Sequence, residues 1–228
     1  KSLQKELFTS NLLTLVASSP SLTPSQPDWS ETVQTCGFLN FEKQDSITSI
    51  PTKLSSFLDE GEPPVYMTFG SCLQYNLKAS TQLLFETAKK LNRRVVIQSD
   101  YPIEETEANQ HIIQISNVPH SLVFPKCALI VHHGGAGTTQ AALLAGRPSL
   151  IIPHGFDQMY WAKHLNKIGV SSSPIERKRA NSTMLAKQLE ALLSDTFAIR
   201  KAQEIGTKMS QENGVSTAVK IISDLNLK

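Results

Sequence analysis

The residues best able to do chemistry form one block in the second half of the chain. It runs from Ala128 to Thr139, and an apolar stretch leads through His132 and His133 into a glycine-rich turn. A strand that enters such a turn and leaves it as a helix offers unpaired backbone N–H groups and the positive end of the helix dipole to an anion. Glycines let the ligand approach the backbone closely. The block predicts a phosphate site, with a purely structural turn as the alternative.

Two familiar phosphate motifs do not fit this block. Gly135 and Gly137 begin a dinucleotide fingerprint, but Gln140 stands at its third glycine position, and no Gly-Lys-Ser/Thr follows as in a P-loop. Asp157 lies at a distance typical of a ribose contact, yet it falls in the loop after the next strand. A nicotinamide dehydrogenase is therefore the weaker interpretation, and the crevice above the strand ends is the expected ligand site.

The paired histidines also raise the question of a metal site, which His154 and Asp157 could complete. Adjacent residues on a strand point to opposite faces, so His132 and His133 cannot easily bind the same ion. We therefore predict no metal site. His133, beside the glycines, is expected to donate a hydrogen bond to a phosphate oxygen, and His132 to be an interior histidine.

The elements that position this block alternate from about residue 64 onward, as parallel strands and crossover helices do. The pattern predicts an α/β fold with a Rossmann-like doubly wound parallel sheet. Strands are expected at Val65–Phe69, Arg94–Gln98, His111–Ile115, Ala128–Val131, Ser149–Ile152 and Val170–Ser172. Helices are expected at Leu77–Leu91, Ser121–Phe124, Thr138–Ala145, Gln158–Ile168, Ser182–Leu193, Asp195–Gln211 and Val215–Leu225.

The first quarter of the chain has a different composition. Leu12–Ala17 is typical of a buried strand, and a signal peptide is the weaker interpretation because polar residues interrupt its core and the chain starts with Lys rather than Met. Residues 18–63 are rich in Pro, Ser and Thr and predict a linker with little regular structure. We expect residues 1–17 to be the remnant of a preceding domain, 18–63 an interdomain linker, and 64–228 the main domain.

Composition excludes several classes of protein. The chain has 22 Lys and Arg against 20 Asp and Glu, a net charge of +2. That balance fits neither a disordered chain nor a nucleic-acid binder. No apolar run approaches the roughly 20 residues of a transmembrane helix. Cys36, Cys72 and Cys127 lie far apart without a Cys-x-x-Cys pair, which predicts reduced thiols and a cytoplasmic protein, with contact to a membrane surface left open.

The blocks together resemble a known family. The run from His132 to Thr139, then Ala145-Gly146-Arg147-Pro148, then Pro153 to Gln158 is similar to the donor-binding half of the inverting UDP-glycosyltransferases. Within that superfamily the chain looks most like the branch of sterol glucosyltransferases and of glycopeptide-antibiotic glycosyltransferases. The resemblance implies the C-terminal half of a GT-B fold, in which two Rossmann-like domains face each other.

The resemblance also implies a set of donor-binding residues around the diphosphate. His133 would contact the diphosphate through its ring, and Ser71 would reach it from the opposite loop. Backbone amides of the glycine turn would cradle it, and these belong to Gly135, Ala136, Gly137 and Thr138.

Further residues would bind the rest of the nucleotide sugar. Val118 would meet the base through its backbone, and His120 would lie near the ribose. Asp157 and Gln158 would bond to the sugar hydroxyls, because a carboxylate accepts hydrogen bonds while an amide both accepts and donates them. Two departures from the plant pattern concern this part: Asn117 occupies the position of the base-stacking Trp, and Ala141 that of the ribose-binding Glu. The donor could therefore carry uridine or thymidine.

In the family the general base is a histidine of the N-terminal domain, and residues 1–16 contain no counterpart. The resemblance therefore implies no catalytic residue in this chain, no required cofactor or metal, and a UDP-sugar or TDP-sugar as donor substrate. Its partners would be an N-terminal acceptor domain and a small lipophilic or polycyclic alcohol that receives a hexose, with glucose the first candidate. Two alternatives stay open: a separate nucleotide-sugar-binding subunit of a bipartite transferase, and an epimerase or phosphorylase, whose families lack this block.

Overall fold

The computed structural model describes residues 12–40, 50–70, 76–103 and 109–225. The chain divides into two compact units: a terminal unit of residues 1–44 and 207–228, and a central unit of residues 45–206. The boundary falls within helix α8 (Thr196–Met209).

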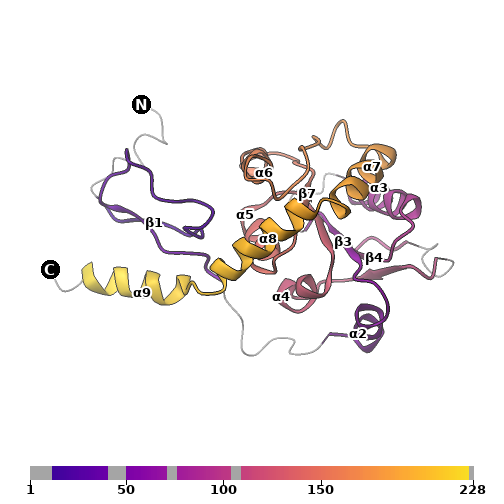
Figure 1. Ribbon diagram of the computed structural model, residues 1–228, viewed down its shortest axis with the longest axis horizontal. Coiled ribbons are helices and arrows are strands. Elements are labelled where there is room, and N and C mark those ends of the chain that lie inside the picture. The colour runs from indigo at the N-terminus through magenta and orange to yellow at the C-terminus, as the bar shows by residue number, and fades with distance from the viewer. Residues whose placement is uncertain (1–11, 41–49, 71–75, 104–108, 226–228) are drawn as a thin grey trace. The chain divides into compact units, whose positions relative to one another are not determined.

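The central unit is built on a five-stranded sheet in the order β5-β4-β3-β6-β7. All four pairings are parallel, which confirms the predicted doubly wound sheet (Figure 1). The strands are β3 (Val65–Thr68), β4 (Val95–Gln98), β5 (Ile112–Ile115), β6 (Leu129–His132) and β7 (Ser149–Ile151). The strand predicted at Val170–Ser172 is reduced to a single bridge between Ser149 and Ser171. Pro174, which has no N–H to donate, follows closely and cannot extend a ladder.

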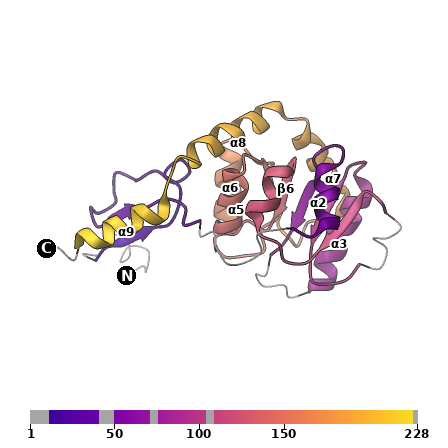
Figure 2. The same ribbon diagram turned by 90° about the horizontal axis from the view of Figure 1, so that it is seen from below.

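Helices enclose this sheet (Figures 1 and 2). They are α2 (Thr52–Asp59), α3 (Leu77–Lys90), α4 (His120–Val123) with the 3₁₀ turn η2 (Phe124–Lys126), α5 (Ala136–Leu144), α6 (Gln158–Lys167), α7 (Ser182–Leu193) and α8. Most match the predicted ranges to within two residues. Helix α5 begins two residues earlier than expected, so Gly135 becomes its N-cap.

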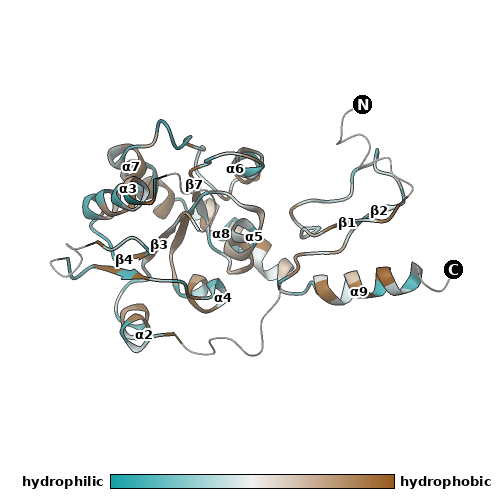
Figure 3. Cartoon of the chain, turned by 180° about the vertical axis from the view of Figure 1, so that it is seen from behind, coloured by the Kyte–Doolittle hydropathy of each residue, from teal (hydrophilic) through white to brown (hydrophobic). Residues whose placement is uncertain are grey.

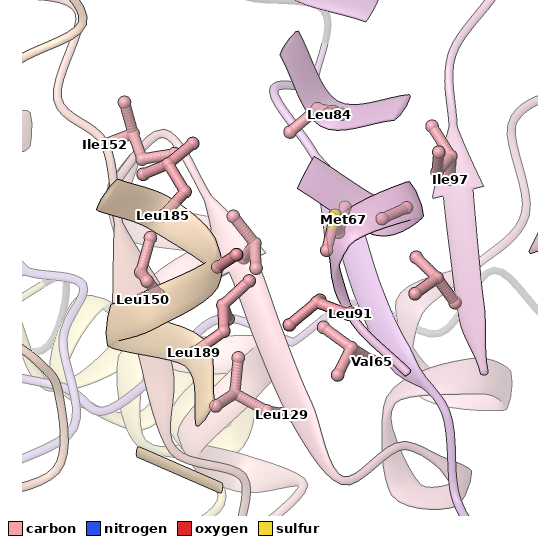
Figure 4. Close-up of a cluster of buried hydrophobic side chains, with 14 of the residues drawn as sticks. Val65, Met67, Leu84, Leu91, Ile97, Leu129, Leu150, Ile152, Leu185 and Leu189 are labelled. Atoms are coloured by element: carbon pink, nitrogen blue, oxygen red, sulfur yellow. The ribbon is translucent and has the colours of Figure 1, made fainter. Parts of the chain in front are cut away.

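Two apolar cores lie on opposite faces of the sheet because successive strand residues point to opposite sides. Val65 and Met67 of β3 belong to the core shared with α3 and α7 (Figure 4). Tyr66, between them in sequence, belongs to the second core, which includes residues of α2 and α5. Strands that are buried on both faces explain the continuous apolar runs in the sequence.

The strand order places a topological switch point between β3 and β6. The chain runs outward from β3 through β4 to β5, then crosses back to β6 and continues to β7. The loops that follow β3 and β6 therefore leave the sheet in opposite directions and open a crevice at the carboxyl ends of the strands. The glycine block follows β6 directly, so the fold carries it to this crevice.

The terminal unit joins the two ends of the chain. Strand β1 (Thr14–Val16) pairs in parallel with β2 (Val33–Thr35), and helix α9 (Gly214–Leu225) belongs to the same unit. The Oγ atoms of Ser19 and Ser21 both donate to Glu212 Oε1, at 2.8 and 2.9 Å. This contact ties the segment after β1 to the residues before α9. Hydrophobic and hydrophilic residues alternate along α9 (Figure 3).

The segment 18–63 is more regular than the sequence predicted. It contains β2 and the eight-residue helix α2, in which Leu54 and Leu58, one helical turn apart, are buried against the sheet. The assignment of 1–17, 18–63 and 64–228 to a remnant, a linker and a main domain stays a prediction. Within the described ranges no helix is long and apolar enough to cross a membrane.

Candidate functional site

A cavity of about 630 Å³ opens at the switch point. That volume lies within the range of small-molecule sites in proteins. Its lining comes from the ends of β3, β4 and β6, the segment after β5 and the start of α5. The lining residues are Thr68, Gly70, Leu77, Gln98, Ser99, Asp100, Asn117, His120, His133, Gly135, Ala136, Gly137 and Thr138.

His133 connects the two loops of the switch point. Its ring lies against Gly70, where a Cβ would stand 3.1 Å from His133 Cε1, and against Gly135, where a Cβ would stand 2.5 Å from His133 Nε2. Only glycine fits at Gly135 without displacing the ring. The sequence thus places the histidine ring and the helix start in direct contact.

The start of α5 supplies the expected backbone donors. Gly135 caps the helix without a side-chain hydrogen bond, and the first turn holds no acidic residue. The first amides of an α-helix have no partner within the helix, and here Ala136, Gly137 and Thr138 line the cavity. Gly134, at φ 92°, gives the turn the left-handed conformation that glycine adopts readily. This end of the cavity can therefore bind an anion.

The two adjacent histidines have different environments. His132 is fully buried, its Nδ1 accepts a hydrogen bond from the Gly134 amide at 3.0 Å, and burial lowers its pKa to about 3. Burial also lowers the pKa of His133, while the charge of Asp157 opposes that shift. Both rings are therefore neutral near pH 7, and the ring planes lie 88° apart. The described residues contain no group of three or more His, Cys, Asp or Glu side chains placed to hold a metal ion.

The rest of the cavity is lined mainly by polar side chains, among which Asp100 carries a carboxylate. His120 stacks on Phe124 with ring centroids 4.2 Å apart, and burial lowers its pKa to about 4. Gln98, at the end of β4, donates from Nε2 to Asn117 Oδ1 at 3.2 Å. The side-chain amides of Gln98 and Asn117 offer neutral hydrogen-bond donors and acceptors, whereas the start of α5 offers backbone N–H groups suited to an anion.

The loop between β7 and α6 is held by Gln158. Its Oε1 accepts hydrogen bonds from the backbone amides of His154, at 2.7 Å, and Gly155, at 3.2 Å. Asp157 Oδ2 accepts from Trp161 Nε1 at 3.1 Å. Phe156, between Gly155 and Asp157 in the sequence, adopts φ 53° and is 80% exposed. Asp157 and Gln158 thus shape this loop and do not line the cavity.

The structure brings most of the expected site residues together. Six of them line the cavity: His120, His133, Gly135, Ala136, Gly137 and Thr138. Val118 is buried, as a backbone contact would allow, and lies outside the lining with Asp157 and Gln158. Ser71 lies outside the described residues. Sequence reasoning missed Gln98, Ser99 and Asp100, although polar residues that end a buried strand are the signal that could have revealed them.

The central unit has the fold of one Rossmann-like half of the GT-B glycosyltransferases. The solved structure of the glycotransferase of kitacinnamycin matches with a TM-score of 0.74 and 20% identity, covering 93% of this chain and 54% of that one. Arabidopsis thaliana UGT89C1 complexed with UDP-L-rhamnose matches with a TM-score of 0.74 and 18% identity, over 92% of this chain and 57% of that one. At such identities the likeness concerns the fold.

Within that class, the chain belongs to the family described as "Erythromycin biosynthesis protein CIII-like, C-terminal domain", whose model matches residues 82–225. Among curated proteins, the sterol 3-beta-glucosyltransferase UGT80A2 of Arabidopsis thaliana is 31% identical over 204 residues. The match covers 89% of this chain and 32% of that relative, so the chain spans about a third of its length. The predicted resemblance to this glycosyltransferase branch is confirmed.

Proposed function

We propose that this chain is the nucleotide-sugar-binding part of a glycosyltransferase. The enzyme would transfer a hexose, with glucose the first candidate, from a UDP-sugar to a hydroxyl of a lipophilic or polycyclic acceptor with inversion. One observation carries the proposal: His133 and the amides that begin α5 share a cavity at the switch point. The sterol glucosyltransferase relative supports glucose and a polycyclic alcohol as the substrates.

The diphosphate would lie at the α5 end of the cavity. The amides of Ala136, Gly137 and Thr138 would donate to its oxygens, and His133, neutral and held against Gly70, would donate from its ring. Such prearranged donors stabilise the negative charge that develops on the leaving nucleoside diphosphate. The helix dipole adds about 0.3–1 kcal/mol, and more where the site is partly buried.

The hexose would extend toward the loop between β7 and α6. With Asp157 Oδ2 bonded to Trp161 and Gln158 Oε1 bonded to two backbone amides, Asp157 Oδ1 and Gln158 Nε2 are the atoms left for sugar hydroxyls. The electrostatic interaction between Asp157 and His133 supports a sugar that lies between this loop and the diphosphate.

In the proposed reaction the acceptor oxygen forms a bond to the anomeric carbon as the bond from that carbon to the diphosphate oxygen breaks. The electron pair leaves with the nucleoside diphosphate, and the hydroxyl proton passes to a general base outside this chain. The role of this chain is to bind and orient the donor and to stabilise the leaving group. Transfer would therefore require an acceptor-binding part.

Thermal unfolding of the chain with a panel of nucleotides tests this function. A ligand that binds only the folded state raises its stability in proportion to the logarithm of its concentration over Kd. We expect UDP, UDP-glucose or dTDP to raise the midpoint, and NAD to leave it unchanged. Stabilisation by NAD without any response to the nucleoside diphosphates would contradict the proposal and favour a dehydrogenase.

A further inference from the structure

A chain of hydrogen bonds leads from the core to Asn117, which lines the cavity. The Tyr66 hydroxyl on β3 donates to Gln98 Oε1 on β4, and Gln98 Nε2 donates to Asn117 Oδ1 at 3.2 Å. Gln98 and Asn117 line the cavity, whereas Tyr66 is fully buried beneath it. A buried residue of the core thus reaches the site through two side chains.

Tyr66 is the fixed end of this chain. Its ring packs edge-on against Phe124, with centroids 5.1 Å apart, and against His120 at 6.2 Å. Burial raises the pKa of its phenol well above the ordinary value, so the hydroxyl keeps its proton and acts as a donor. The contacts with Phe124 and His120 hold the ring, and the hydrogen bond to Gln98 Oε1 sets the direction of the hydroxyl.

The fixed hydroxyl determines the orientation of both amides. An amide has one accepting oxygen and one donating nitrogen. Because Gln98 accepts the Tyr66 proton through its oxygen, its nitrogen faces Asn117. Asn117 accepts the Gln98 hydrogen bond through its Oδ1. Its Nδ2 makes no hydrogen bond to any residue in the described ranges, so its two N–H groups are available to a ligand. The cavity consequently presents N–H groups, and not carbonyls, at this position.

Gln98 ends β4 and Asn117 follows β5, whereas the glycine turn follows β6 on the other side of β3. If the diphosphate occupies the α5 end, the nucleoside would extend along the strand ends toward Gln98 and Asn117, which line the same cavity. Uracil and thymine carry a carbonyl acceptor at C4, whereas cytosine carries an amino donor there. The N–H donors of Asn117 would distinguish these two kinds of base.

We propose that Asn117 is a specificity-determining residue that donates to the carbonyl of a uracil or thymine base, and that Tyr66 and Gln98 are positioning residues that orient it. The inference rests on the proposed function and deepens it. It assigns base selection to side chains at a position where the sequence lacks the stacking Trp of the plant pattern.

Calorimetry of the chain with UDP and with CDP tests the assignment. We expect the wild-type chain to bind UDP at least roughly tenfold more tightly than CDP, because a donor facing the cytosine amino group leaves both unpaired. Asn117→Asp replaces the donor with an acceptor and should lower the UDP/CDP affinity ratio by roughly tenfold or more. The UDP/CDP affinity ratio is measured, and not the UDP affinity alone, because the added negative charge weakens the binding of both diphosphates.

Asn92→Asp is the matched control, since it adds the same charge at an exposed residue outside this cavity and should leave the ratio unchanged. An Asn117→Asp chain that binds UDP with an unchanged ratio would overturn the inference and leave the proposed function standing. A folded wild-type chain that binds no UDP would instead contradict the proposed function itself.

Tyr66→Phe tests the positioning role. It retains the packed ring and removes the hydroxyl, which frees the Gln98 amide to turn over and present its oxygen to Asn117. We expect the UDP/CDP ratio to fall by roughly threefold to tenfold. Tyr160→Phe, which removes a hydroxyl from an exposed ring on α6, should leave it unchanged. A folded Tyr66→Phe chain with the wild-type ratio would show that the core hydroxyl does not orient Asn117.

Discussion

The ring of His133 fills the space beside the Cα of Gly135: a Cβ on that residue would lie 2.5 Å from His133 Nε2. The ring of His133 and the absence of a side chain at Gly135 therefore together shape the end of the cavity at the start of α5. The same ring lies against Gly70, so this histidine bridges the residues that follow β3 and β6 at the switch point.

Gly135→Ala should displace the His133 ring. The obstructing atom belongs to a side chain and not to the backbone, so we expect the fold to persist while the ring turns away from the cavity. UDP affinity should fall by roughly tenfold or more, the loss of one charge-assisted hydrogen bond. Calorimetry with UDP measures this change in affinity. Gly155→Ala is the control, because nothing lies within 4 Å of its added Cβ; equal losses in the two variants would contradict this account.

Gly137→Ala separates stability from binding. A Cβ there meets nothing within 4 Å, and alanine favours a helix over glycine by about 0.5–1 kcal/mol. Urea unfolding should therefore show unchanged or greater stability. UDP affinity should fall nonetheless, because the methyl group enters the cavity beside the α5 amides. Unchanged affinity would mean that the diphosphate does not approach this turn.

Gln158→Ala should loosen the loop between β7 and α6. It removes the oxygen that accepts from the amides of His154 and Gly155, at a cost of about 1–3 kcal/mol in the free energy of unfolding. Gln158→Glu retains an accepting oxygen, so its free energy of unfolding should remain close to that of the wild type. Denaturant titration of both variants measures the free energy of unfolding. An equal loss in the two variants would contradict this expectation and indicate that the amide nitrogen of Gln158 stabilises the loop.

Stability should fall in mild acid. His132 has a pKa of about 3 in the folded state against 6.5 for an unperturbed histidine, so the unfolded chain binds a proton that the folded chain does not. The stabilisation is complete above about pH 6.5 and is lost as pH falls, by up to about 1.4 kcal/mol per pH unit from this group. His120 and His154, each near 4, act in the same direction. Unfolding free energies that are equal at pH 7.5 and pH 5 would contradict this expectation.

The sheet, the helix order and the position of the glycine turn at the start of a helix could be predicted from the sequence because they depend on local signals. Apolar runs that are buried on both faces indicate parallel strands, and the glycine turn after His133 indicates a helix start open to a ligand. The prediction of α5 was two residues late, since Gly135 and Gly137 weaken the helix signal without preventing the helix.

Other features depend on contacts between distant residues and had no local signal. The Tyr66 to Gln98 to Asn117 chain joins three strands or strand ends, and only the register of β3 with β4 brings the first two together. The hydrogen bonds that Gln158 Oε1 accepts from the amides of His154 and Gly155 likewise depend on the conformation of the loop between β7 and α6. Sequence patterns assign residue types to these positions but not the direction of each hydrogen bond.

The central claim is that His133 and the start of α5 bind the diphosphate of a nucleotide sugar. Calorimetry of the chain with UDP-glucose, for the wild type and for His133→Ala, tests it most directly. We expect one binding site in the wild type and an affinity at least roughly tenfold weaker in the variant, with both chains folded by circular dichroism. Equal affinities, or no binding by the folded wild-type chain, would contradict it.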